Sequence, residues 1–128
     1  MEDKELTEKI IGCAMKVHSA LGFGFLESVY HKALAHELRK AGLAVDCEKA
    51  IAVYYDNIIV GDFSADIMVE NRVMVELKAN QALVTANEVQ LVNYLTATNL
   101  ETGLLMNFGA ERLEFKRKSR TYRPKMNL

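Results

Sequence analysis

Residues 62–78 read DFSADIMVENRVMVELK, a pattern that predicts two antiparallel β-strands joined by a tight turn. Apolar and polar residues alternate in both halves, because successive side chains of a strand point to opposite faces of the sheet. Asp66 lies in the first strand, with Ala65 expected on the opposite face. Glu76 and Lys78 lie two residues apart in the second strand. If the two acids and the lysine share one face, they form a site for a divalent metal ion with a cation beside it.

The register of this hairpin determines whether the acids meet. If the turn held only Asn71 and Arg72, Asp66 would lie opposite Leu77 and point away from Glu76, because paired residues share a face. A connection with an odd number of residues, or a bulge in one strand, would bring the two acids together. Three-residue hairpin loops with a bulge are a common type. The metal-site interpretation therefore requires one of these two geometries.

The rest of the chain predicts helices and strands on both sides of this hairpin. Apolar residues recur at three- and four-residue steps, the pattern of an amphipathic helix, in residues 3–21, 25–40 and 85–98. Strand patterns occupy residues 50–55, 58–61, 103–109 and 113–116. In the third helix, Val89 and Leu95 are expected on the buried side. The predicted order α-α-β-β-β-α-β-β contains no repeat and no linker.

Composition indicates one globular domain covering residues 1–128, with 50% hydrophobic and 26% charged residues. Cys13 and Cys47 match no disulfide or zinc spacing, which favours a reducing compartment. The polar N-terminus MEDKELTEK is not a secretory signal, and no apolar run approaches the ~20 residues of a membrane span. We therefore expect a soluble cytoplasmic protein.

Charge is distributed unevenly along the chain. Residues 1–110 hold 9 Lys and Arg against 15 Asp and Glu, whereas residues 111–128 hold 7 against 2. The basic residues of this last segment are Arg112, Lys116, Arg117, Lys118, Arg120, Arg123 and Lys125. They would either contact a polyanion, since phosphate neutralisation drives non-specific nucleic-acid binding, or form a solvated last strand and a basic tail over residues 119–128.

The chain resembles the PD-(D/E)XK nuclease superfamily in three features: Asp66, the run Glu76-Leu77-Lys78 on the next strand, and Gln90-x-x-x-Tyr94 on a helix. Its predicted order follows the αβββαβ core of that superfamily, and the helix motif is similar to that of the RecB-like branch. Residues 24–30, GFLESVY, match the motif that names the GxxExxY proteins, small bacterial and archaeal proteins of mostly uncharacterised function. The resemblance extends over roughly residues 5–118.

Two positions depart from the superfamily pattern. Ala65 stands where a proline often precedes the first active-site aspartate. Asn87 stands where relatives often carry a histidine shortly before the helix glutamine. The second difference is expected to alter substrate contacts more than metal binding.

The resemblance implies both a fold and an activity. The fold is a restriction-endonuclease-like α/β domain, in which helices flank a central mixed sheet and an extra N-terminal helix precedes the core. The activity is hydrolysis of phosphodiester bonds in DNA, in preference to RNA, with Mg²⁺ or Mn²⁺ as cofactor. Asp66, Glu76 and the backbone carbonyl of Leu77 would bind the metal. Lys78 would offset the negative charge that develops beside the scissile phosphate.

The other motif residues would support this chemistry. Glu27, on the second helix, would orient a water molecule or hold a second ion. Gln90 and Tyr94 are four residues apart and share a helix face, so they would bind phosphate or support Lys78 and Glu27. Tyr30 would act in the same way.

Three other interpretations remain open. The hairpin acids could form a solvated face, in which Lys78 makes a cross-strand ion pair worth well under ~1 kcal/mol. The chain could also be a nucleic-acid- or protein-binding module that keeps the fold without catalysis. The third interpretation is that the chain is a structural subunit whose strands form an oligomer interface. The nuclease hypothesis is favoured because a binder of phosphate has no need for a cluster of carboxylates.

The chain shows no obvious recognition domain, so specificity would come from a homodimer or from a partner protein. His18, His31 and His36 share no ligand spacing with the cysteines and are interpreted as surface or partly buried residues.

Overall fold

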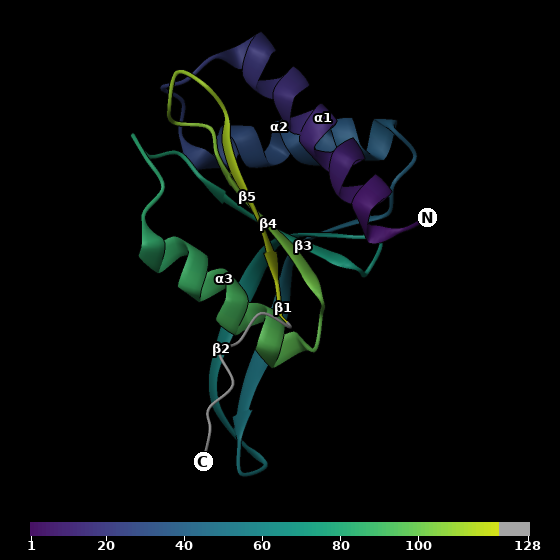
Figure 1. Cartoon of the computed structure of the whole chain (residues 1–128), viewed down its shortest axis with the longest axis vertical. Coiled ribbons are helices and arrows are strands. Elements are labelled where there is room, and N and C mark those ends of the chain that lie inside the picture. The colour runs from purple at the N-terminus through teal and green to yellow at the C-terminus, as the bar shows by residue number, and fades with distance from the viewer. Residues whose placement is uncertain (121–128) are drawn as a thin grey trace.

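The computed structural model describes residues 1–120, in which three helices surround a five-stranded sheet (Figure 1). The helices are α1 (Asp3–Leu21), α2 (Glu27–Lys40) and α3 (Thr85–Thr98). The strands are β1 (Val45–Tyr55), β2 (Ile58–Val69), β3 (Val73–Lys78), β4 (Thr102–Asn107) and β5 (Glu114–Ser119). This order confirms the predicted α/β fold, with an αβββαβ core and an additional N-terminal helix.

The strands lie in the sheet in chain order, β1-β2-β3-β4-β5. Within residues 1–120, β3 and β4 are the one parallel pair, and the remaining pairs are antiparallel. Helix α3 connects β3 to β4, because a parallel pair needs a crossover that a short turn cannot provide. β4 is buried along its whole length, as its continuous apolar sequence predicts, and β5 forms one edge of the sheet.

Helices cover both faces of the sheet and create two cores. The larger core lies between α1, α2 and one face, and includes Leu6, Ile10, Leu34, Ile67, Val75 and Leu104. The smaller core lies under α3 and contains Ala65, Met68, Met74, Leu91, Leu95 and Leu105. Each large buried apolar side chain contributes about 1.5–3 kcal/mol relative to its exposed state. These contacts fix α2 and α3 on opposite sides of the β2–β3 hairpin.

The β2–β3 hairpin has the odd loop that the metal-site interpretation requires. Val69 pairs with Val73, so residues 70–72 form a three-residue connection. Glu70 and Asn71 both adopt φ of 54°, in the left-handed region. Glu70 also ties the loop to the chain entering β1, because its carboxylate accepts a hydrogen bond from the amide of Ala44 at 2.7 Å. The required register is therefore present.

The strict alternation predicted for β2 fails next to Asp66. Ala65 packs with Met68 in the core under α3, whereas Ile67 lies in the core under α1 and α2. Glu48 on β1 explains the change, because it has φ of 54° and interrupts the pairing between Cys47–Ile67 and Lys49–Ala65. The irregularity lies opposite Asp66, the residue at which β2 stops pairing with β3.

Helix α3 contacts the sheet through a set of residues that the prediction matched only in part, since Leu95 is buried as expected and Val89 is not. Leu91 and Leu95 are fully buried, whereas Val89 is 53% exposed. Gly103 on β4 explains this orientation, because a Cβ atom there would stand 2.9 Å from Cδ1 of Leu91. The glycine thus leaves the space into which Leu91 packs, a feature of the partner strand that the helical pattern alone does not contain.

Gly109 is a second position where a close approach requires glycine, and it carries a prediction for stability. A Cβ atom at Gly109 would lie 2.4 Å from backbone atoms of Ala79 and Asn80, which follow β3 directly. Backbone atoms cannot move aside as a flexible side chain can, so Gly109→Ala is expected to lower the free energy of unfolding by about 2 kcal/mol or more. Urea denaturation measures this change.

Gly12→Ala provides a control of opposite sign. No atom lies within 4 Å of a Cβ built at Gly12, which occupies the middle of α1. Alanine there is expected to stabilise the protein by about 0.5–1 kcal/mol through helix propensity. Equal stabilities for the two variants would contradict the steric argument at Gly109.

Candidate metal centre

Asp66 and Glu76 lie side by side at the open end of the β2–β3 hairpin. Ile67 pairs with Val75, which makes the two acids cross-strand neighbours. The carboxylate of Glu76 accepts a hydrogen bond from the amide of Asp66 at 3.4 Å, and the carboxylate of Asp66 accepts one from the amide of Leu77 at 2.9 Å. The structure thus brings these two predicted site residues together.

The carboxyl group of Glu76 is held in an environment that opposes its ionisation. Glu76 is only 7% exposed to solvent. Burial, and then the negative charge of Asp66, raise the pKa of Glu76 to about 8, although Lys78 partly opposes this shift. A buried acid beside a second acid is an electrostatically unfavourable arrangement of the kind that typically marks a functional site.

Glu27 and Lys78 belong to the same electrostatic group. Glu27 is the first residue of α2, so its carboxylate lies near the positive end of the helix dipole. Burial and the charge of Asp66 raise the pKa of Glu27, whereas Lys78 and His31 lower it. Helix α2 therefore directs this acid toward the charged residues of the hairpin.

Tyr94 approaches the acids from α3, on the other side of the hairpin. Its ring stacks on Phe63 of β2 with centroids 3.6 Å apart and planes inclined by 13°. Burial raises the pKa of Tyr94, and the charges of Glu76 and Asp66 add to the effect. Gln90 lies one helical turn earlier and is exposed. The hydroxyl of Tyr94 is thus the polar group that α3 adds to the acids.

Tyr30 points away from this group. Its side chain is fully buried and stacks on Phe108 with centroids 5.0 Å apart. Its hydroxyl donates a hydrogen bond to the carbonyl of Gly22 at 2.7 Å and accepts one from the amide of Phe25 at 3.2 Å. Tyr30 therefore fixes the loop that leads into Glu27, and its buried ring leaves no surface for a substrate.

Comparison with protein-family models gives a match to the PD-(D/E)XK nuclease superfamily over residues 4–118. The chain belongs to this superfamily. A solved structure described as "Crystal structure of SSO0001" has a TM-score of 0.58 and 17% sequence identity, and the match covers 73% of this chain and 50% of that chain. At this identity the likeness shows the fold alone, and this chain spans about half the length of that protein. A search of curated proteins gave no match.

The donor set is suited to the divalent metals that PD-(D/E)XK nucleases generally use. Within residues 1–120, no three His, Cys, Asp or Glu side chains are arranged to hold a metal ion together. The carboxylate of Glu27 is thus not grouped with those of Asp66 and Glu76 in this arrangement. Two carboxylates remain, and Mg²⁺ is typically bound by one or two carboxylates, with waters and substrate oxygens completing its shell. A divalent cation would also neutralise the repulsion that raises the pKa of Glu76.

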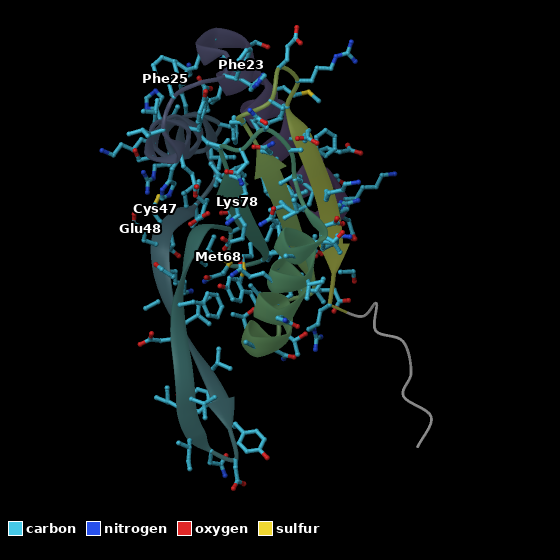
Figure 2. The ribbon with its side chains drawn as sticks, turned by 90° about the vertical axis from the view of Figure 1, so that its left-hand side faces the viewer. Phe23, Phe25, Cys47, Glu48, Met68 and Lys78 are labelled. Atoms are coloured by element: carbon cyan, nitrogen blue, oxygen red, sulfur yellow. The ribbon has the colours of Figure 1, made fainter. Side chains whose placement is uncertain are left out.

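Sequence reasoning missed two features that lie next to Glu27. His31 lies one turn after Glu27 on α2, and its Nε2 atom is buried without a hydrogen-bond partner among the described residues. The four-residue spacing from Glu27 was the signal that could have indicated it. Phe23 and Phe25 are 59% and 50% exposed in the loop before Glu27, at the end of the molecule far from the β1–β2 hairpin (Figure 2).

Three of the four basic residues on β5 and directly after it make contacts within the protein: Arg117, Lys118 and Arg120. Arg117 donates hydrogen bonds to the side chain of Thr7 and to the carbonyl of Asp3. Lys118 pairs with Glu88, and Arg120 pairs with Glu101 at 3.1 Å. Arg123 and Lys125, with most of the predicted basic tail, lie outside the described residues. These contacts direct part of the predicted basic cluster to the protein itself.

None of the helices within residues 1–120 combines the length and the apolar character needed to cross a membrane.

Proposed function

We propose that this protein is a divalent-metal-dependent nuclease that hydrolyses phosphodiester bonds of DNA, in preference to RNA. The observation that carries the proposal is the contact between Asp66 and Glu76 on neighbouring strands, with one carboxyl almost free of solvent. Membership of a nuclease superfamily supports it. A solvated hairpin face would not bury an acid against another acid, because burial of like charges is unfavourable unless a ligand compensates for it.

Each candidate site residue has its own role in the proposed phosphodiester hydrolysis. Asp66, Glu76 and the carbonyl of Leu77 are suited to hold Mg²⁺ or Mn²⁺, which when bound would acidify a water molecule and stabilise charge on phosphoryl oxygens. The ammonium group of Lys78 offsets negative charge beside the scissile phosphate. Glu27, whose pKa is raised, is suited to orient a water molecule and accept its proton. Tyr94 can donate a hydrogen bond to a phosphate oxygen.

The proposal also includes the family and the branch of the superfamily to which the chain is assigned. The GFLESVY segment at residues 24–30 supports membership of the GxxExxY proteins, and the Gln90 and Tyr94 pair supports the RecB-like branch. The chain would act in the cytoplasm as a single domain. Specificity would come from a homodimer or from a partner protein.

Metal binding and cleavage provide the test. Calorimetric titration with Mg²⁺ and with Mn²⁺ is expected to show uptake by the wild type and none by the variant Asp66→Ala/Glu76→Ala, since the two carboxylates are the charged ligands. Cleavage of single- and double-stranded DNA, with RNA as a comparison, should be lost in the same variant. Asp62→Asn is the matched control, because Asp62 is an exposed acid on the same strand.

The control variant should bind metal and cleave DNA as the wild type does. A folded wild type that takes up neither metal would overturn the proposed function. Metal uptake without cleavage of any of the three substrates would leave a binding module with the nuclease fold.

A further inference from the structure

A hollow of about 420 Å³ lies between one flank of helix α2 and the start of β1. We call it the α2–β1 groove, and its polar lining consists of His31, Lys32, His36 and Arg39 from α2 and of Cys47 and Glu48 from β1. Arg39 joins the two sides, because its guanidinium donates hydrogen bonds to the carbonyl of Val45 at 3.2 Å and to Sγ of Cys47 at 3.7 Å. These contacts fix the width of the groove at this end.

The other end of the groove adjoins the candidate metal centre. His31 lies one helical turn after Glu27 on α2. Glu48 interrupts the pairing of β1 with β2 directly opposite Asp66. In Figure 2, Glu48 lies on β1 just below the helices, at nearly the same height as Lys78. The groove is therefore within reach of a phosphate chain that is held at the metal centre.

The two cations of the groove keep free hydrogen-bond donors. Lys32 is exposed and makes no hydrogen bond or ion pair with any other residue in the range 1–120. Both hydrogen bonds of Arg39 use the same nitrogen, Nη2, so its other two nitrogens are available to a ligand. By contrast, Lys40 on the same helix is paired with Glu37 at 3.5 Å. The groove therefore offers an external anion two positive charges that the protein itself does not neutralise.

A chain of phosphates is the anion that matches the spacing of these cations. Helix α2 rises roughly 10 Å from residue 32 to residue 39. Along a duplex one strand places a phosphate every ~3.4 Å of the axis, so this rise corresponds to about three phosphates. The imidazole of His36 can donate a further hydrogen bond to a phosphate oxygen. A metal ion is not the ligand, because in the described part of the chain no three of the His, Cys and acidic side chains are arranged to hold one.

We propose that the α2–β1 groove binds the sugar–phosphate backbone of the nucleic acid next to the scissile phosphate, with Lys32 and Arg39 as its cations. This inference rests on the proposed function, since it places the substrate strand of the same site. Phosphate contacts fix the position and direction of a strand and carry no sequence information, so the groove positions substrates of any sequence. Glu48 is the acidic residue of the groove, and its carboxylate repels the phosphates. Loss of charge at Glu48 and at Lys32 must therefore change binding in opposite directions.

Equilibrium binding of the full chain to a short DNA duplex, measured in a chelator so that no strand is cleaved, tests the proposal. At low salt, Lys32→Gln is expected to weaken binding about 5-fold and Lys32→Gln/Arg39→Gln about 30-fold. The slope of log K against log salt concentration should become shallower by about 1 and about 2 in these variants, because each lost phosphate contact releases fewer counterions. Glu48→Gln is expected to tighten binding about 3-fold, since it removes a charge that repels phosphate.

Lys4→Gln is the matched control, because it removes the same charge from an exposed lysine of α1. Its neighbour Asp3 pairs with Arg72 in the loop at the other end of β3, so Lys4→Gln should bind DNA as the wild type does.

Circular dichroism establishes that each variant is folded, and Lys32→Gln alone leaves the contacts of Arg39 with β1 in place. A wild type that does not bind DNA overturns the proposal. Equal losses in Lys32→Gln and Lys4→Gln, or a Glu48→Gln variant that binds no more tightly than the wild type, also overturn it. Metal uptake and cleavage report on the metal centre separately. If both were absent while these binding changes were observed, the proposed function would fail and the groove would stand as a nucleic-acid contact.

Discussion

Lys78→Met is expected to lower the rate of DNA cleavage by about 10²–10³-fold, the usual effect of removing one group that stabilises charge in a transition state. Methionine keeps the apolar stem of the side chain and removes the ammonium group. Lys78 is the cation that opposes the raised pKa values of both Glu27 and Glu76, which places its charge among the acids. The measurement is the single-turnover cleavage rate at saturating Mg²⁺.

Metal uptake separates this effect from damage to the ligands. Because Lys78 supplies no metal ligand, Lys78→Met should still bind Mg²⁺ in a calorimetric titration. Lys116→Met is the matched control, since Lys116 is an exposed lysine on the edge strand β5. It should cleave at the wild-type rate. Unchanged cleavage by Lys78→Met would exclude Lys78 from the chemistry.

Glu76→Gln is expected to change how the stability of the metal-free protein depends on pH. The pKa of Glu76 is about 8 in the folded state against 4.5 for an ordinary glutamate. Between these pH values the folded chain keeps a proton that the unfolded chain has released. The free energy of unfolding therefore falls as pH rises through this window, by roughly 5 kcal/mol. Glutamine has no proton to release, so the variant lacks this contribution.

Urea denaturation in a chelator, at pH 5 and at pH 9, measures the difference. The wild type should lose stability relative to Glu76→Gln between the two pH values, and Mg²⁺ should restore it at pH 9, because the cation favours the ionised acid. Glu48→Gln is the control, since Glu48 is exposed. Parallel pH profiles for wild type and Glu76→Gln would contradict the burial argument.

Much of the fold could be predicted because local patterns and long-range contacts agree. The stripe of Leu6, Ile10 and Val17 predicts α1, and each of these residues is buried against the sheet. The apolar run that begins at Gly103 predicts a strand covered on both faces, as β4 is. Hydrophobic periodicity carries this information, because each element must bury one face or both.

Other features depend on a partner element and could not be predicted from local patterns. The face that α3 presents to the sheet depends on the space above Gly103, and the position of Ala65 depends on the backbone of Glu48 on the neighbouring strand. Both are properties of two elements in contact. Strict period-two alternation cannot represent a change of side within one strand.

The candidate metal centre also combines features that local patterns predict with features that depend on packing. The residue types and their order indicated Asp66 and Glu76, but pattern alone could not choose between an even and an odd loop. The contact of Tyr30 with Gly22 also escaped prediction, since Tyr30 lies on α2 and Gly22 lies at the far end of the preceding loop, whose course was unknown. Spacing in the sequence locates chemical groups along an element, whereas their direction follows from the packing of that element.

The three-residue loop between β2 and β3 has a consequence for how this chain can change during evolution. Nine residues separate Asp66 from Glu76. Deleting or inserting one residue in the loop would exchange the two faces of β3, so that Glu76 would enter the apolar core and Leu77 would take its place. Adding or removing two residues would preserve the face. Tolerated length changes at this loop should therefore come in even numbers. The site requires an odd number of loop residues as well as the two acids.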